Sequence, residues 1–355
     1  MARLRLAIVG ARRERQGIGE FVAREFLAAG TELCAVVGTR DETVADALSK
    51  LRGPGAEETQ GFTSLSAAIE TARPDVVAIC SPFRHHLEAL DIVANSGCHC
   101  LCEKPLWWDP SLDVGRETER LVDAFAQRRR HLALVTQWPE TLGDFYRLYP
   151  EARDEPLRNF EMHLAPRRGG AAMALDAAPH PISMLQTLLG RGDIENVEAK
   201  YSRADGDALC LTFSYRHSAG VTTARCHFTV CEEPPRPASY SLNGRWVHRT
   251  VELPEYQLYL TRPGSPRSDR SGVQSESEEK ATEEKRVPIE DPLKSLVVGF
   301  VRQLERAGQS RENLSGEESC GTDVQRQLLI ESMLGLQALV KAAEAAEERQ
   351  VVDSN

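Results

Sequence analysis

The sequence lacks any long apolar run. A helix that crosses a membrane needs about 20 consecutive apolar residues, and no segment of the 355 residues comes near that length. The apolar run at residues 6–9 is also too short for a secretory signal, and it leads directly into a glycine loop. We therefore expect a cytoplasmic protein that has no membrane partner.

An excess of basic residues is also lacking. The chain has 43 Lys and Arg against 53 Asp and Glu, which gives a formal net charge of -10. Because a surface that binds phosphate backbones has to be basic, this balance argues against a nucleic-acid partner. Individual arginines can still hold a small anionic ligand, so we expect the partner to be a small-molecule substrate.

Metal-site spacing is the third feature that the sequence lacks. Cys98, His99, Cys100 and Cys102 form a dense run of soft ligands, and alternation along a strand would put the thiols on one face. No second Cys/His pair follows at a spacing typical of zinc sites. The nine cysteines are an odd number, which is typical of reduced thiols. No metal site is expected.

The first part of the chain alternates between strands and helices. Apolar runs predict strands at residues 4–9, 32–37, 75–80, 98–102 and 132–136. Helices are expected between them, at residues 18–29 and beginning at Asp41, Ser64, His86 and Ser111. Strands that alternate with helices across short turns indicate a doubly wound parallel sheet. We assign residues 1–138 to this domain.

The pattern changes from about Trp138 onward. Hairpin-sized separators divide strand-like segments at residues 158–164, 197–202, 208–215, 221–230, 245–251 and 256–261. Helices are expected at residues 182–189, 293–307 and 321–345, and the polar segment at about 262–285 is expected to be a mobile loop. Residues 139–355 therefore predict an α+β domain with an open-faced, mainly antiparallel sheet flanked by helices. Its free face could pair with a second copy in a homodimer or homotetramer.

Glycines mark a dinucleotide site at the first strand-to-helix turn. Gly10 ends the first strand, and Gly17, Ile18 and Gly19 open the first helix. Glycines there let the backbone approach a pyrophosphate, and the helix N-terminus offers free N–H groups. The loop between them is longer than the G-x-G-x-x-G pattern allows. Its context still predicts a Rossmann domain that binds NAD or NADP.

The end of the second strand favours NADP over NAD. An acidic residue there would bind a ribose hydroxyl, whereas an arginine would accept a 2'-phosphate. Thr39 and Arg40 occupy this end, and Arg12 or Arg13 could assist them. Asp41 follows, but it is expected to cap the next helix.

Three further motifs resemble those of the glucose-fructose oxidoreductase/inositol dehydrogenase (Gfo/Idh/MocA) family. The first is Ser81-Pro82 followed by His86, and the second is Glu103-Lys104-Pro105 after the next strand. The third is the glycine pair at residues 169–170, followed by Asp176 and His180. Their order and spacing cover nearly the whole chain.

The resemblance implies a nicotinamide-dependent dehydrogenase or reductase that acts on CH–OH groups of a sugar-, cyclitol- or polyol-like molecule. By carry-over, Lys104 binds the reacting oxygen, His180 exchanges its proton and Asp176 orients the substrate or the histidine. The same resemblance implies that Ser81, Pro82, His86, Glu103 and Lys104 contact the cofactor. An imidazole suits the proton transfer because it titrates near neutrality.

Departures from the family pattern point to a different substrate pocket. Phe83 replaces an expected asparagine, and Ala178 replaces an expected glycine. The segment at residues 136–139, which contains Trp138, lacks an arginine that family members often have there. Trp138, Arg167 and Arg168 are candidate substrate residues, since the two arginines could bind a carboxylate or phosphate. Two alternatives stay open: a catalytically silent NADP-sensing regulator or scaffold of this fold, and a C=C or C=N reductase in which Asp176 is dispensable.

Overall fold

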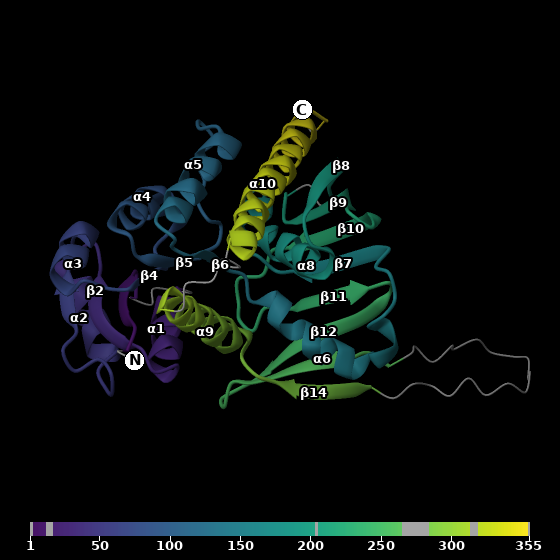
Figure 1. Ribbon diagram of the computed structural model, residues 1–355. Coiled ribbons are helices and arrows are strands. Elements are labelled where there is room, and N and C mark those ends of the chain that lie inside the picture. Colours follow the sequence, from purple (N-terminus) through teal and green to yellow (C-terminus); the bar gives the residue numbers. More distant parts are fainter. Residues whose placement is uncertain (1–2, 12–16, 203–204, 265–283, 313–318, 354–355) are drawn as a thin grey trace, which may run out of the picture. The chain divides into compact units, whose positions relative to one another are not determined.

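The computed structural model describes residues 3–11, 17–202, 205–264, 284–312 and 319–353 (Figure 1). The chain forms two compact units. The first comprises Met1–Gln137 with Pro292–Gln337, and the second comprises Trp138–Asp291 with Ala338–Asn355.

The first unit contains a six-stranded parallel sheet with the order β3-β2-β1-β4-β5-β6. Its strands are β1 (Arg5–Val9), β2 (Glu32–Val37), β3 (Gln60–Phe62), β4 (Val76–Ile79), β5 (His99–Glu103) and β6 (Leu132–Val135). Its helices include α1 (Gly19–Ala28), α2 (Asp41–Lys50), α3 (Leu65–Ala72), α4 (His86–Ser96) and α5 (Val114–Gln127). The predicted doubly wound sheet is confirmed. The strand order reverses between β1 and β4, which is where ligands bind in open sheets of this kind.

Two predictions about helix starts are wrong. Helix α5 begins at Val114 and not at Ser111, because the carboxylate of Asp113 caps it by accepting the N–H of Arg116 at 2.9 Å. Arg40 precedes α2 as its cap residue, so that Asp41 is already the first helical residue. The predicted start of α3 is confirmed, since Ser64 accepts the N–H of Ala67 at 3.4 Å.

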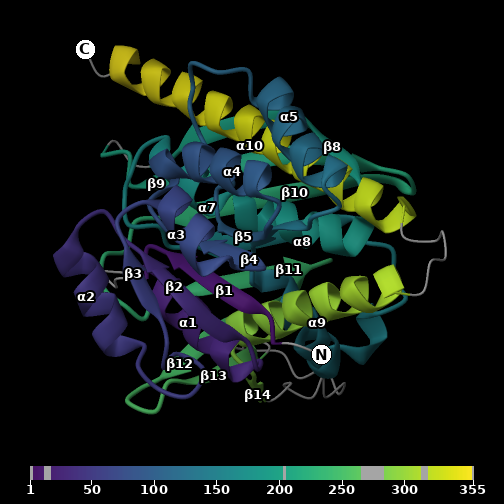
Figure 2. The ribbon, with the colours of Figure 1, turned by 60° about the vertical axis from the view of Figure 1, so that its left-hand side comes forward.

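Helix α9 (Pro292–Glu312) groups with the first unit. The ring of Phe300 meets the ring of Phe26 in α1 edge to face, with centroids 6.4 Å apart, and Val297 and Leu304 join the same core. Both ribbon views show α9 near α1 (Figures 1 and 2). This grouping differs from the sequence-based division, which assigned residues 139–355 to the second domain. The long helix α10 (Ser319–Asp353) follows it.

The second unit contains an eight-stranded sheet with the order β14-β13-β12-β11-β7-β10-β9-β8. The pair β7·β10 is parallel and the other pairs are antiparallel. The strands are β7 (Asn159–Leu164), β8 (Gly192–Tyr201), β9 (Ala208–His217), β10 (Gly220–Thr229), β11 (Ala238–Leu242), β12 (Arg245–Glu252), β13 (Gln257–Arg262) and β14 (Lys285–Ile289). The accompanying helices are α6 (Leu142–Leu148), α7 (Ala172–Ala177) and α8 (Pro179–Leu189). The predicted fold class is confirmed. Most of the predicted mobile loop, residues 265–283, lies outside the described residues.

The second sheet has one buried face and one outward face. On β7, Phe160, Met162 and Leu164 are buried, whereas Glu161 and His163 between them point to the other side. Helix α6 packs against β13 and β14, and α7 packs against β10. None of the described helices is both long and apolar enough to cross a membrane.

Candidate functional site

The start of α1 packs directly against the ends of β1 and β4. Gly10 has a φ of +82°, and a Cβ built on it would lie 2.8 Å from the backbone nitrogen of Ser81. A Cβ on Gly19 would collide with the carbonyl oxygen of Gly10. Neither position has room for a side chain. The turn from β1 into α1 thus packs tightly against the end of β4, at the point where the strand order reverses. In open sheets of this kind a pyrophosphate binds at this point, and we call the turn the glycine crevice.

The rest of the glycine loop is described only in part. Gly17 lies just before α1, and Ile18 is the residue that precedes the first helical turn. The side chain of Ile18 packs against the hydrophobic core, so only its backbone can face the crevice. Arg12 and Arg13 lie outside the described residues.

His86 connects the two loops that follow β4 and β5. Its side chain is fully buried, with Nε2 2.7 Å from the carbonyl oxygen of Ser81 and Nδ1 2.9 Å from that of Pro105. Burial lowers the pKa of His86, which favours the neutral ring. These contacts make His86 a residue that positions the loops, in contrast to its predicted direct contact with a cofactor.

Ser81, whose backbone nitrogen adjoins the crevice, carries a buried side-chain hydroxyl. Its buried hydroxyl has no hydrogen-bond partner in the part of the chain that the structure describes. A buried hydroxyl without a partner is costly, and a hydrogen bond to a bound ligand would satisfy it. Pro82, which follows, is exposed and opens a short 3₁₀ turn. These residues fit a dinucleotide at this edge of the sheet.

Glu103 and Lys104 lie at the same edge as Ser81. Glu103 ends β5 and Lys104 follows it, and both are half-buried. Since Ile79 of β4 is in register with Cys102 of β5, the loops after these neighbouring strands start side by side. Lys104 therefore follows the strand next to β4, at the carboxyl edge of the sheet, where ligands bind in open sheets.

Thr39 and Arg40 are exposed at the end of β2. The hydroxyl of Thr43 donates a hydrogen bond to the carbonyl oxygen of Arg40 at 2.7 Å, which fixes the turn into α2. Asp41, in the first turn of α2, is the nearest carboxylate along the chain. The turn therefore presents a guanidinium and a carboxylate at consecutive positions.

Asp176 and His180 belong to the second unit and lie on one side of a helical segment. Asp176 is in α7 and His180 is the second residue of α8, and Ala178 between them is also helical, with φ −63° and ψ −26°. Residues four apart on a helix face the same direction. Both side chains are half-buried.

Sequence reasoning missed Arg236 beside this pair. Burial lowers the pKa of Arg236, the neighbouring charge of Arg167 adds to the shift, and the carboxylate of Asp176 opposes it. One guanidinium nitrogen of Arg236 donates to the carbonyl oxygen of Ala165 at 3.0 Å. The structure therefore gathers Arg167, Arg236 and Asp176, whereas Arg168 is exposed. Arg236 lies in the proline-rich loop between β10 and β11, which contains no sequence motif that would have identified it.

Trp138 is a core residue of the second unit. It is only 3% exposed, and its ring meets that of Tyr240 edge to face at 6.1 Å. The guanidinium of Arg249 lies 5.2 Å from the ring centroid. These contacts occupy the indole with packing, so they do not support its predicted role in substrate binding.

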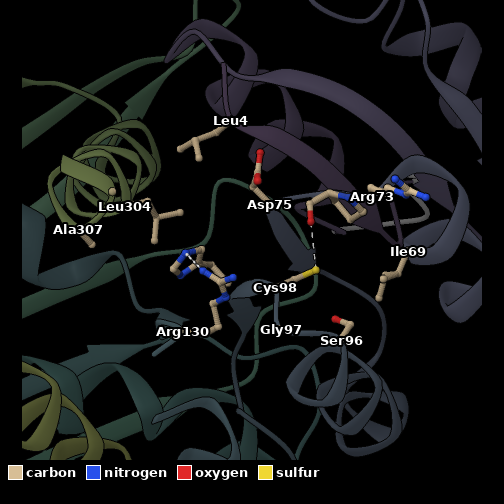
Figure 3. A pocket seen from close by; sticks show the side chains of 13 residues that line it. Leu4, Ile69, Arg73, Asp75, Ser96, Gly97, Cys98, Arg130, Leu304 and Ala307 are labelled. Atoms are coloured by element: carbon tan, nitrogen blue, oxygen red, sulfur yellow. Dashed lines mark hydrogen bonds between the residues drawn. The ribbon is translucent and has the colours of Figure 1, made fainter. Parts of the chain in front are cut away.

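The cysteine run extends along β5, from Cys98 at the amino end of the strand to Cys102 near its carboxyl end, and a pocket lies at the amino end. A cavity of about 360 Å³ opens there and is lined by residues that include Asp75, Cys98 and Arg130 (Figure 3). The thiol of Cys98 donates to the carbonyl oxygen of Pro74 at 3.1 Å, and burial raises the pKa of Cys98 and Cys100. Protonated, buried thiols are poor metal ligands. The cavity is at the amino ends of the strands, away from the crevice at their carboxyl ends.

Comparisons with known proteins agree with this geometry. Residues 4–135 match the family described as an oxidoreductase family with an NAD-binding Rossmann fold. A D-glucoside 3-dehydrogenase of Escherichia coli (strain K12) is 34% identical over 104 residues, which cover 29% of this chain and 27% of the relative. A UDP-N-acetylglucosamine 3-dehydrogenase of Acidithiobacillus ferrooxidans is 25% identical over 231 residues, 62% of this chain and 66% of the relative. The matches thus span about a quarter and about two thirds of these relatives.

The solved structure of the Acidithiobacillus ferrooxidans enzyme has a TM-score of 0.66 at 19% identity, and the superposition covers 98% of this chain and 100% of that one. At this identity the likeness concerns the fold. The family match adds the cofactor class, because it covers every strand of the parallel sheet, the glycine crevice and Lys104. Residues 4–135 therefore belong to the Gfo/Idh/MocA oxidoreductase family and form its NAD-binding Rossmann domain.

Proposed function

We propose that this protein transfers a hydride between NAD(P) and an alcohol or ketone carbon of a sugar-, cyclitol- or polyol-like molecule. The observation that carries the proposal is that Lys104 follows β5, the neighbour of β4, at the carboxyl edge of the sheet that also carries the glycine crevice. We assign proton transfer to Asp176 and His180, which lie on one helical face of the second unit. A family that includes proteins named as sugar dehydrogenases supports this class of substrate.

The proposed chemistry assigns one task to each side chain. NAD(P), when bound, supplies the hydride or accepts it. Oxidation of an alcohol also requires a base for the hydroxyl proton, and the imidazole of His180 has that capacity near neutral pH. The ammonium of Lys104 stabilises the negative charge that develops on the same oxygen. Asp176, four residues before His180, orients the substrate or the imidazole.

Arg236 and Arg167 extend the proposal to the substrate's charge. Arg236 and Arg167 interact electrostatically near the carboxylate of Asp176, and a guanidinium is suited to bind a phosphate or carboxylate group. One relative is named for a sugar attached to a diphosphate. We therefore include anionic sugar derivatives among the proposed substrates.

The proposal is tested with purified protein, NADP⁺ or NAD⁺, and a panel of neutral polyols, cyclitols and anionic sugar derivatives. The expected result is substrate-dependent formation of reduced cofactor, with greater kcat/KM for an anionic member than for its neutral counterpart. The reverse reaction is followed with the matching ketones. Tight cofactor binding without turnover of any panel member would favour a silent NADP-sensing protein instead.

Arg40 is proposed to select NADP over NAD. Its exposed guanidinium at the end of β2 is suited to a 2'-phosphate. Arg40→Ala is expected to weaken NADPH binding by about 10-fold or more, since a charge-assisted pair contributes about 1.5–3 kcal/mol. NADH binding should change by less than about threefold. Calorimetric titration of both cofactors measures the two effects, and equal losses for both would contradict the assignment.

A further inference from the structure

Three side chains of types that bind metal ions lie together on the outward face of the second sheet. None of them belongs to the segments that form the dinucleotide crevice. His163 on β7 is in register with His227 on β10, and Glu161 precedes His163 by two residues on the same face. One ligand atom from each of the three residues lies within 4.8 Å of the others. Such a separation allows one ion to contact all three.

The geometry comes from an unusual feature of this sheet. Strands β7 and β10 are its one parallel pair among the pairings that the structure describes, and this pairing places the two imidazoles directly across from each other. Their ring centroids are 4.6 Å apart at an interplanar angle of 72°. The ring of Trp246 packs against His163 at 4.7 Å, which fixes one side of the group.

The donor set fits a borderline divalent cation. Two imidazole nitrogens and one carboxylate oxygen are ligands that zinc accepts, and three protein ligands leave one position of a tetrahedral ion open to water. A neutral imidazole is the form that binds a metal ion.

We propose that Glu161, His163 and His227 form a binding site for Zn²⁺ or a similar divalent transition-metal ion on the outward face of the second sheet. None of these residues takes part in the proposed hydride transfer. The metal-site proposal is therefore tested independently of the proposed function. The site has a free coordination position and does not need the cofactor.

Zinc binding by the full chain tests the site. After treatment with EDTA and its removal, equilibrium dialysis against Zn²⁺ with elemental analysis is expected to show one tightly bound ion per chain. Loss of an indirect partner of a metal ligand weakens binding by about 10–100-fold. Loss of a direct ligand in His163→Gln or His227→Gln should therefore weaken it by at least about 100-fold. Titration with Co²⁺ should give the visible spectrum of a tetrahedral site.

His217→Gln is the matched control. His217 lies at the end of β9 in the same sheet. Its ring forms a hydrogen bond with the hydroxyl of Thr222, and it is outside the three-residue group. The His217→Gln variant should bind Zn²⁺ as tightly as the unmodified chain. Glu161→Gln provides a third ligand change, and circular dichroism with NADPH titration confirms folding in every variant. Absence of zinc binding, or binding that His163→Gln and His227→Gln leave unchanged, would overturn the proposal.

Discussion

Lys104→Ala is expected to lower kcat/KM for hydride transfer by about 1,000-fold or more, with the Kd for NADPH changed by less than about threefold. The expectation follows from the proposed task of the ammonium, which is to stabilise charge that develops only in the transition state. Groups that act in proton transfer or at developing charge typically contribute about 100- to 10,000-fold. Steady-state kinetics and calorimetric titration of the cofactor measure the two quantities separately.

Two variants serve as controls for this result. Lys104→Arg keeps the positive charge in a different shape and should retain more activity than the alanine variant. Lys200→Ala removes an exposed lysine from β8, where its amino group lies 3.8 Å from Glu198, and should leave kcat/KM unchanged. A Lys104→Ala protein that turns over within about tenfold of the unmodified chain would contradict the assignment.

Gly10→Ala is expected to destabilise the first unit by about 2–5 kcal/mol and to weaken cofactor binding. A non-glycine residue at a φ of +82° costs about 1–2 kcal/mol. The added Cβ would also lie 2.8–2.9 Å from the backbone of Cys80 and Ser81, and overpacking of this kind costs about 1–3 kcal/mol. The midpoint of urea unfolding, followed by circular dichroism, measures the loss.

Gly30→Ala separates the two causes. Gly30 also has a positive φ, +91°, but a Cβ there would meet nothing within 4 Å. This variant should show only the conformational cost of about 1–2 kcal/mol and unchanged NADPH affinity. Equal effects of the two substitutions on stability and on affinity would show that the crevice has room for a side chain.

Local sequence patterns predict most of the first unit. Four of its strands are buried apolar runs bounded by turn residues, so they are recognisable one segment at a time. The short strand β3 escaped prediction because its three residues, Gln60, Gly61 and Phe62, carry no alternation. Lys104 and Gly10 became candidates because each directly follows a strand, and Gly19 became one because it opens the first helix.

The second unit shows where local patterns fail. Strand β11 is buried along its whole length although Ser239 and Ser241 interrupt its apolar residues. Strand β14 contains Pro288 and two basic residues, which is typical of an edge strand and resembles a loop in sequence. The fold class was still predictable, because the remaining strands alternate with turn signals.

The missed functional residues depend on contacts between distant segments. Arg236 approaches Asp176 only because the segment before β11 returns beside β7. Glu161, His163 and His227 come together only because β7 pairs with β10 in parallel. Spacing along the chain contains neither relation. By contrast, His86 lies in a motif that the sequence shows, but the motif does not reveal that both ring nitrogens contact backbone carbonyl oxygens.

The most direct test of the central claim is a crystal structure of the protein with NADP⁺ and a substrate identified in the panel. We predict that the Lys104 ammonium and the His180 imidazole both lie within about 3.2 Å of one substrate oxygen. The carbon that bears this oxygen should face the reactive carbon of the nicotinamide. A complex in which these two side chains lie in separate cavities would contradict the proposed hydride transfer.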